Sequence, residues 1–161
     1  MALWRELRRA GAVPLGQAAW AVPDLPAVHP VLQRLSDLAS VGNGQLLVLS
    51  ARGHAAADVD RLKQLYTAAR EQEWTEWRAD CARYLAELDK EEAVAKYTLA
   101  ELEEEEQSLD RLRRWYRDLR ARDLLASPPP STPPPTSRSA SSRFDAYAEH
   151  IYTAVGSHPL D

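Results

Sequence analysis

The stretch KYTLAELEEEEQSLDRLRRWYRDLRARDLL, residues 96–125, is the most informative part of the chain for predicting its fold. Thr98 followed by Glu101 predicts a capping box, in which each residue satisfies a backbone N–H of the other at a helix start. Five glutamates fill residues 101–106 and arginines fill the last turns, an order that complements the helix dipole. The apolar residues recur at helical spacing: Leu102, Leu109, Leu112, Tyr116 and Leu119. The stretch therefore predicts a long helix with one face against a partner.

The preceding sequence predicts a second long helix from about Ala57 onward. Its apolar stripe extends over roughly 30 residues, which corresponds to about 45 Å of helix. The stripe consists of Leu62, Tyr66, Ala69, Trp77, Cys81, Tyr84 and Leu88. A turn within residues 90–96 would bring the two helices together. Residues 57–125 are therefore expected to form a long antiparallel αα-hairpin.

Five shorter elements are predicted in residues 1–56. A helix over residues 2–10 ends at Gly11, and a glycine is a common helix stop. A hairpin follows, with strands at 12–15 and 18–22 around a Gly-Gln turn. A helix over 29–40 and a short buried strand over 45–50 complete this region.

The order helix, strand, strand, helix, strand is that of a ferredoxin-like unit without its first strand. We therefore predict an α+β protein in which residues 1–56 are an incomplete ferredoxin-like unit. The absent strand would be central, and its neighbours would keep unpaired backbone groups. Two explanations stay open: the reading frame begins inside the domain, or another segment or chain fills the gap.

The C-terminal part has a sharp change of composition. Residues 126–142, ASPPPSTPPPTSRSASS, are too rich in proline and serine to bury a core, which predicts a disordered linker. A polyproline II ligand is the alternative interpretation. Residues 143–157 return to helical spacing, with Phe144, Tyr147, Ile151 and Val155 on one face. They are expected to form a terminal helix that docks on the protein.

Composition limits the classes of function. The chain has 161 residues and a net charge of −4, so it has no overall attraction to nucleic acid or to an anionic membrane. Cys81 is its only cysteine, which excludes an internal disulfide and a CxxC metal site. No apolar run reaches 18 residues, and charges interrupt the N-terminus, so we expect no membrane span and no signal peptide. A cytoplasmic location is the expectation.

Several segments carry a family resemblance. The helix wording K-Y-T-L-A-E-L-E-E-E-E-x-x-L-x-x-L-x-x-W, followed by A-R-D-L-L, resembles the N-terminal region of ChrB-type chromate resistance proteins. The matching positions are Lys96, Thr98, Ala100, Glu101, Leu102, Glu103, Glu104, Leu109, Leu112, Trp115, Ala121, Arg122 and Asp123. Further agreement lies in W-R-x-L-x-x-x-G-A at 4–12, W-A-V-P at 20–23, E-W at 76–77 with the cysteine at 81, and F-D-A-Y-A-E-H-I-Y at 144–152.

This resemblance implies a role in chromate resistance as a chromate-responsive transcriptional regulator. The same region of the family is similar to the middle domain of PaaX-like repressors, which implies a ferredoxin-like fold. The sequence departs from longer family members, because its residues contain neither the separate C-terminal chromate-resistance domain nor an evident helix-turn-helix.

The sequence predicts no catalytic residues. Its four histidines are scattered and show no HxxxH or HExxH spacing, so no metal site is expected. It contains no GxGxxG or P-loop motif, and we expect no cofactor and no enzymatic activity. Cys81 lies on an apolar stripe, which favours a buried packing thiol over a redox sensor. The glutamate run favours a solvated helix face over a cation site.

Two groups of arginines are the candidate binding sites for DNA phosphate or an oxyanion such as chromate. One group lies on the organising helix and the other on the first helix: Arg113, Arg114, Arg117 and Arg120; Arg5, Arg8 and Arg9. The alternative is that the first group only pairs with acids of the facing helix, such as Glu73, Glu76 and Asp80. Trp77 is expected in the core, and Trp74 and Trp115 at a surface contact.

The sequence therefore predicts a non-enzymatic regulatory module of the chromate-resistance type, with DNA and chromate as partners. A helical protein-interaction module is the second hypothesis. In that case a homodimer would form through the edge of the missing strand or through the helical hairpin. The salt dependence of binding distinguishes the two hypotheses, because phosphate binding weakens steeply with salt and apolar pairing does not.

Overall fold

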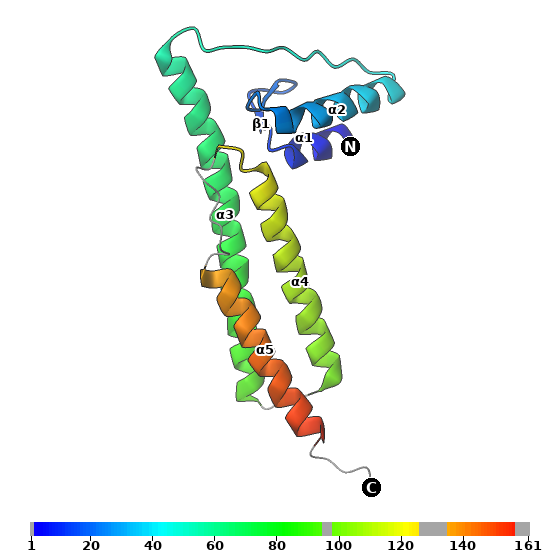
Figure 1. The fold of residues 1–161 in the computed structure, drawn as a ribbon, viewed down its shortest axis with the longest axis vertical. Helices are drawn as coiled ribbons and strands as arrows, with labels where there is room; N and C mark the ends of the chain where they lie inside the picture. The colour runs from blue at the N-terminus through cyan, green and yellow to red at the C-terminus, as the bar shows by residue number, and fades with distance from the viewer. Residues whose placement is uncertain (1, 95–97, 126–134, 157–161) are drawn as a thin grey trace. The chain divides into compact units, whose positions relative to one another are not determined.

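The computed structural model describes residues 2–94, 98–125 and 135–156. These residues are mostly helical and include one small two-stranded sheet (Figure 1). The elements in order are α1 (Ala2–Arg9), β1 (Val13–Pro14), β2 (Trp20–Ala21), η1 (Pro26–Val28), α2 (His29–Val41), α3 (Ala56–Ala93), α4 (Leu99–Arg122) and α5 (Pro135–Gly156). They divide into a first unit, residues 1–72 and 118–127, and a second unit, residues 73–117 and 128–161.

In the first unit, the predicted hairpin forms between α1 and α2. Strands β1 and β2 pair antiparallel, with Val13 opposite Ala21 and Pro14 opposite Trp20. The pairing is short, in agreement with prolines that cannot continue a ladder. Helix α2 ends before Gly42, whose N–H bonds to the carbonyl of Leu38. The core residues of this unit come from β1 and the residue before it, from η1 and α2, and from the parts of α3 and α4 that belong to the unit: Ala12, Val13, Val28, Leu35, Ala39, Tyr66 and Leu119.

The predicted strand over residues 45–50 is wrong. These residues connect α2 to α3 as extended chain, and no strand forms there (Figure 1). Leu47 and Leu49 are 80% and 73% exposed, so the segment is not buried either. A strand needs a neighbour for its backbone N–H and C=O groups, and none of the described residues pairs with it. The structure therefore shows two strands in place of three, and the ferredoxin-like unit is not confirmed.

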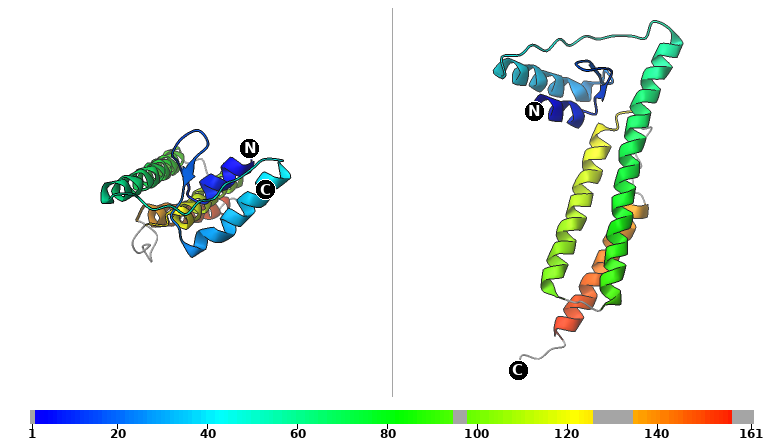
Figure 2. Two further views of the ribbon diagram at one scale, coloured as in Figure 1. Left: turned by 90° about the horizontal axis from the view of Figure 1, so that it is seen from above. Right: turned by 180° about the vertical axis from the view of Figure 1, so that it is seen from behind.

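In the second unit, parts of α3, α4 and α5 run side by side, as both Figure 1 and the rear view in Figure 2 show. The helical hairpin is confirmed. The indole N–H of Trp77 in α3 donates to the carbonyl of Leu112 in α4, at 3.1 Å. The apolar stripes predicted for both helices supply its core, with the last residues coming from α5: Trp77, Cys81, Tyr84, Leu88, Leu102, Leu109, Leu112, Ala140, Tyr147 and Ile151.

The start of α4 and that of α5 differ in how well the sequence predicted them. At α4 the backbone N–H of Glu101 donates to the Thr98 hydroxyl at 3.3 Å, as the capping box requires. The hydroxyl in turn donates to the Glu101 carboxylate, at 2.9 Å. Helix α5 starts at Pro135 and not at residue 143, and proline fits a first helical turn. Residues 126–134 of the predicted linker lie outside the described residues, and the predicted domain boundaries stay a prediction.

Candidate functional site

Helix α1 presents three of the candidate arginines at the surface. Arg5, Arg8 and Arg9 are all exposed, and the last two lie in the final turn, where cations are favoured. The helix ends in a Schellman motif. The N–H of Ala12 bonds to the carbonyl of Leu7, and that of Gly11 to the carbonyl of Arg8, both at 3.0 Å. Gly11 has a φ of 75°, the left-handed conformation that this motif requires.

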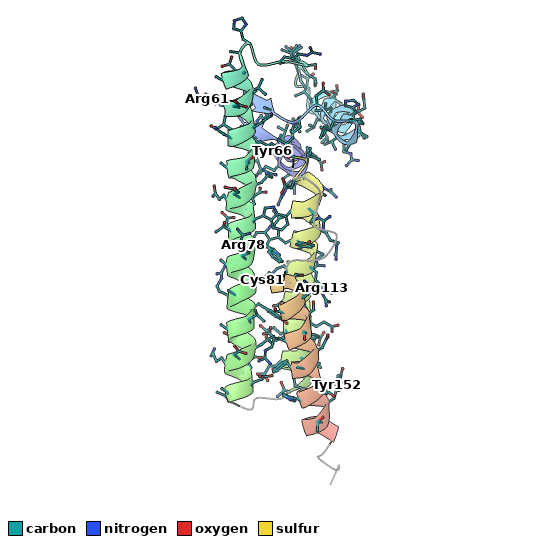
Figure 3. The ribbon with its side chains drawn as sticks, turned by 60° about the vertical axis from the view of Figure 1, so that its left-hand side comes forward. Arg61, Tyr66, Arg78, Cys81, Arg113 and Tyr152 are labelled. Carbon is teal, nitrogen blue, oxygen red and sulfur yellow. The ribbon has the colours of Figure 1, made fainter. Side chains whose placement is uncertain are left out.

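The end of α1 lies against the end of α4 within the first unit. A Cβ atom on Gly11 would come within 2.5 Å of the carbonyl oxygen of Arg122, so only glycine permits this approach. Tyr66 of α3 fixes the same place: its hydroxyl donates to the Arg122 carbonyl and accepts from the N–H of Leu124 at 3.2 Å. Tyr66 is labelled in Figure 3. A buried tyrosine and a glycine thus hold the end of α4 in place.

A pocket of about 630 Å³ opens in the first unit among α1, η1, α2 and the end of α4. Its charged lining is predominantly basic, with five arginines against two carboxylates. The lining residues that carry the argument are Arg5, Arg8, Arg9, Arg34, Arg122 and Trp4. The carboxylates are Glu6 and Asp118, so the formal excess is three positive charges. Small and branched apolar residues, including Val28 and Val31, form the rest.

Within this arginine pocket, Glu6 neutralises part of the charge. Its carboxylate lies 4.0 Å from a guanidinium nitrogen of Arg9 and 3.7 Å from one of Arg34. Arg8 lies over the ring of Trp4, with its guanidinium carbon 4.7 Å from the ring centroid. Such a cation–π contact orients the guanidinium without consuming its hydrogen-bond donors. The pocket therefore holds oriented donors beside a local acid.

The arginines predicted on the organising helix lie elsewhere. Arg113 and Arg117 belong to the second unit, and Arg113 contacts Asp110 at 3.5 Å and the Ser141 hydroxyl at 3.1 Å. Arg114 and Arg117 are exposed. Arg120 lies in the first unit but does not line the pocket that the described residues form. The structure thus brings together only the α1 group.

Sequence reasoning missed two basic residues and the aromatic residue of this pocket. Arg34 projects from α2, and its link to Arg9 runs through Glu6, which is 28 residues earlier in the chain. Arg122 is among the positions of the family motif, but the sequence gives no sign that it lies beside the arginines of the first helix. Trp4 and Arg8 are four residues apart, and this spacing is the one local signal that could have found the stacked pair. The remaining members depend on packing between helices.

The glutamate run on α4 is only partly the solvated face that the sequence predicted. Glu103, Glu104 and Glu106 are exposed, but Glu101 and Glu105 are buried. Burial, together with charge repulsion from Glu91, Glu104 and Glu87, raises the pKa of Glu105 to about 7. Glu101 and Glu105 are buried because a third helix, α5, covers part of a face that would be open in a two-helix hairpin. Tyr147 of α5 donates to the carboxylate of Glu91 there, at 2.7 Å.

The predictions of a buried Trp77 and a buried Cys81 are confirmed. Trp77 is 1% exposed and packs in the core as expected. Trp74 and Tyr116 join it in an aromatic cluster, with ring centroids 5.4–5.9 Å apart. Cys81 is fully buried, and desolvation raises its pKa to about 11. A thiol in that state is protonated at neutral pH, which agrees with a packing role.

Two further observations concern the described residues alone. No group of three or more histidine, cysteine, aspartate or glutamate side chains in residues 2–94, 98–125 and 135–156 is placed to hold a metal ion. No helix in the same ranges is both long and apolar enough to span a bilayer.

Comparison with protein families gives one clear result. The family model described as "Protein ChrB, N-terminal" matches residues 1–158, which is nearly the whole chain. The chain therefore belongs to this family, and the resemblance inferred from the helix motif is confirmed. Comparisons with curated proteins and with solved structures found no match.

Proposed function

From its membership of the ChrB N-terminal family, we propose that the chain is a regulatory module of chromate resistance. In this proposal it is a non-catalytic, chromate-responsive transcriptional regulator. It binds an oxyanion or a DNA phosphate at the arginine pocket of the first unit. The observation that carries the proposal is the convergence of five arginines from α1, α2 and α4 on one cavity.

The chemistry of the pocket suits a tetrahedral oxyanion. A guanidinium group presents paired N–H donors that match two oxygens of a phosphate or of a chromate dianion. Arg8, oriented by Trp4, and Arg5 on the same helix supply such donors in the lining of the pocket. Glu6 lies between Arg9 and Arg34, and its negative charge reduces the repulsion between these two cations. The excess positive charge favours a dianion over a monoanion.

The same pocket offers a route for the effector to act on DNA binding. A DNA phosphate and a free oxyanion are competing ligands for the same guanidinium groups. An oxyanion in the pocket would displace a phosphate and weaken the contact with DNA. Regulation in this form needs no covalent step, no metal and no cofactor.

The test is a fluorescence-anisotropy titration with DNA from upstream of the gene for this protein. It is run at low and high salt, with and without chromate, and with sulfate as the control anion. We expect binding that weakens steeply with salt and that chromate releases more effectively than sulfate. Absence of binding at low salt would contradict the DNA part of the proposal, and chromate calorimetry on the free protein tests the oxyanion part separately.

Variants assign the site. The double substitution Arg5→Ala with Arg8→Ala removes two lining guanidinium groups and is expected to weaken binding roughly tenfold or more. The matched variant, Arg113→Ala with Arg117→Ala, changes the same charge in the second unit and should leave binding within about twofold. The reverse ranking would move the site to α4. Arg61→Ala, an exposed arginine of α3, is the control for net charge.

The proposal retains the ferredoxin-like interpretation of the first unit. Its support is the observed order of α1, the β1–β2 hairpin and α2, which matches the middle of that fold. Completing the sheet would require residues 45–50 to pair with a further strand.

A further inference from the structure

The segment between α2 and α3 has the backbone of a strand without a strand beside it. Residues 45–52 run as extended chain, visible in Figures 1 and 2. Among the described residues, none forms a backbone hydrogen bond with this segment. A side-chain hydrogen bond, donated by the Ser50 hydroxyl to the Asp24 carboxylate at 2.8 Å, ties the segment to the rest of the unit. The edge is therefore open to any polypeptide that can add a strand.

The side chains of the segment are those of a buried strand. Residues 46–49, Leu-Leu-Val-Leu, form a continuous apolar run, which is typical of a strand covered on both faces. In this structure Leu47, Val48 and Leu49 are 80%, 48% and 73% exposed. Proteins normally protect such an edge with a lysine, a proline or a bulge, and residues 45–51 contain neither lysine nor proline.

The apolar surface continues from this segment onto α3. A Cβ atom on Gly53 would come within 2.7 Å of a methyl carbon of Val59, so the end of the segment lies against the first turns of the helix. Val59, Leu62 and Leu65 of these turns are 37–47% exposed. A four-residue strand alone is too small for a stable interface, since each partner of a standard one buries about 800 Å². Strand and helix together offer the larger surface that such an interface needs.

We propose that residues 45–50 are a dimerisation edge, at which a second copy of this chain adds the same segment as an antiparallel strand. Two identical strands related by a two-fold axis satisfy each other's N–H and C=O groups. A pairing centred on Leu47, with the two Leu47 residues opposite each other, keeps opposed side chains on the same face of the ribbon and places Arg52 opposite Gly42. No like charges then oppose each other, since residues 44–51 carry no charge. A second copy of the chain is therefore complementary to this edge.

The test is sedimentation velocity of the full chain over a wide concentration series at high salt. High salt suppresses association through the arginine pocket but leaves apolar strand pairing intact. We expect a reversible monomer–dimer equilibrium. A chain that sediments as a monomer throughout the series would overturn the proposal.

Two variants locate the interface. Val48→Pro removes a backbone donor from the edge and keeps the extended conformation, and Leu47→Lys places two lysines close together in the dimer. Each should raise the dimer dissociation constant roughly tenfold or more, with an unchanged circular dichroism spectrum of the monomer. Leu15→Lys, at a residue of the β1–β2 turn that is 50% exposed, is the matched control and should leave the dissociation constant unchanged. A dimer that withstands both edge variants would overturn the proposal as firmly as a monomeric wild type.

Discussion

The two units bury their apolar side chains to different degrees. In the second unit, three helices bury their stripes against one another, and Trp77, Leu88 and Ile151 are at most 1% exposed. In the first unit, helices pack beside a hairpin of two residue pairs, while Leu47 and Leu49 stay in solvent. A helix satisfies its own backbone, but a strand depends on a neighbour. The difference teaches that local pattern suffices for the helical unit and falls short where pairing is required.

The largest effect is expected at the centre of the helical unit. Trp77→Ala removes a buried ring and leaves the Leu112 carbonyl without its indole donor. The free energy of unfolding should fall by about 3–5 kcal/mol, as measured by chemical denaturation. Trp4→Ala, at a residue that is 48% exposed, should cost less than about 1 kcal/mol. Equal losses for the two tryptophans would break the comparison, because the second unit would then have no privileged core.

In the first unit, the largest effect is expected at the contact between α1 and the end of α4. Gly11→Ala introduces a Cβ at a φ of 75° and within 2.5 Å of the Arg122 carbonyl oxygen. The free energy of unfolding should fall by about 1–3 kcal/mol, since both the dihedral and the close approach become unfavourable. Gly16→Ala is the matched control, because nothing lies within 4 Å of its Cβ position. If both glycines tolerate alanine equally, the end of α4 is not fixed in the way described.

The stability of the second unit is expected to depend on pH through the buried Glu105. The pKa of Glu105 is raised to about 7 in the folded chain from an ordinary 4.5, so the folded state holds its proton more tightly than the unfolded state does. This contribution to stability is complete below the unfolded pKa and is lost as pH rises through about 7. The loss amounts to about 1–3 kcal/mol between pH 5 and 8.

Glu105→Gln removes the titration, so its free energy of unfolding should depend less on pH and exceed the wild-type value at pH 8. Denaturation curves across this range measure the difference. Glu106→Gln, an exposed neighbour, is the control and should keep the wild-type pH dependence. A wild-type chain whose stability does not decline toward pH 8 would contradict the burial of an ionisable Glu105.

The smallest effect concerns the ion pairs of α5. Arg143 contacts Asp89 at 2.5 Å and Glu92 at 2.8 Å, but the pairs are partly exposed. Arg143→Ala should therefore cost at most about 1 kcal/mol, and less at high salt. Thermal unfolding at two salt concentrations measures this, with the exposed Arg138→Ala as control. A larger, salt-independent loss would mean that charge, and not the burial of Tyr147 and Ile151, holds α5 in the second unit.

The sequence predicted the elements whose signals are local. The cap at Thr98, the stop at Gly11 and most of the stripes of α3 and α4 each depend on residues a few positions apart, and the structure confirms them; Leu62, the first residue of the predicted α3 stripe, is 40% exposed. The prediction of a strand at 45–50 was wrong because a neighbouring strand, and not composition alone, decides whether a strand forms. The burial of Glu105 was not predicted because its environment includes α5, a helix that begins 30 residues later in the sequence.

The candidate site shows the same limit. Arg5, Arg8 and Arg9 were found because they lie on one short helix, and the structure places all three at the pocket. Arg34 and Arg122 come from helices that only tertiary packing brings to α1. The arginine face predicted on α4 was a correct observation of helical spacing, but spacing alone does not create a concave site.

The state of Cys81 has a practical consequence for labelling. Its side chain is fully buried, and its thiol stays protonated up to a pKa of about 11. Maleimide reagents attack exposed thiolates, so the folded native chain should react very slowly at neutral pH. A cysteine introduced at an exposed position would then be the single reactive thiol, without any need to replace Cys81. The chain is thus suited to site-specific attachment of fluorescent or spin probes as it stands.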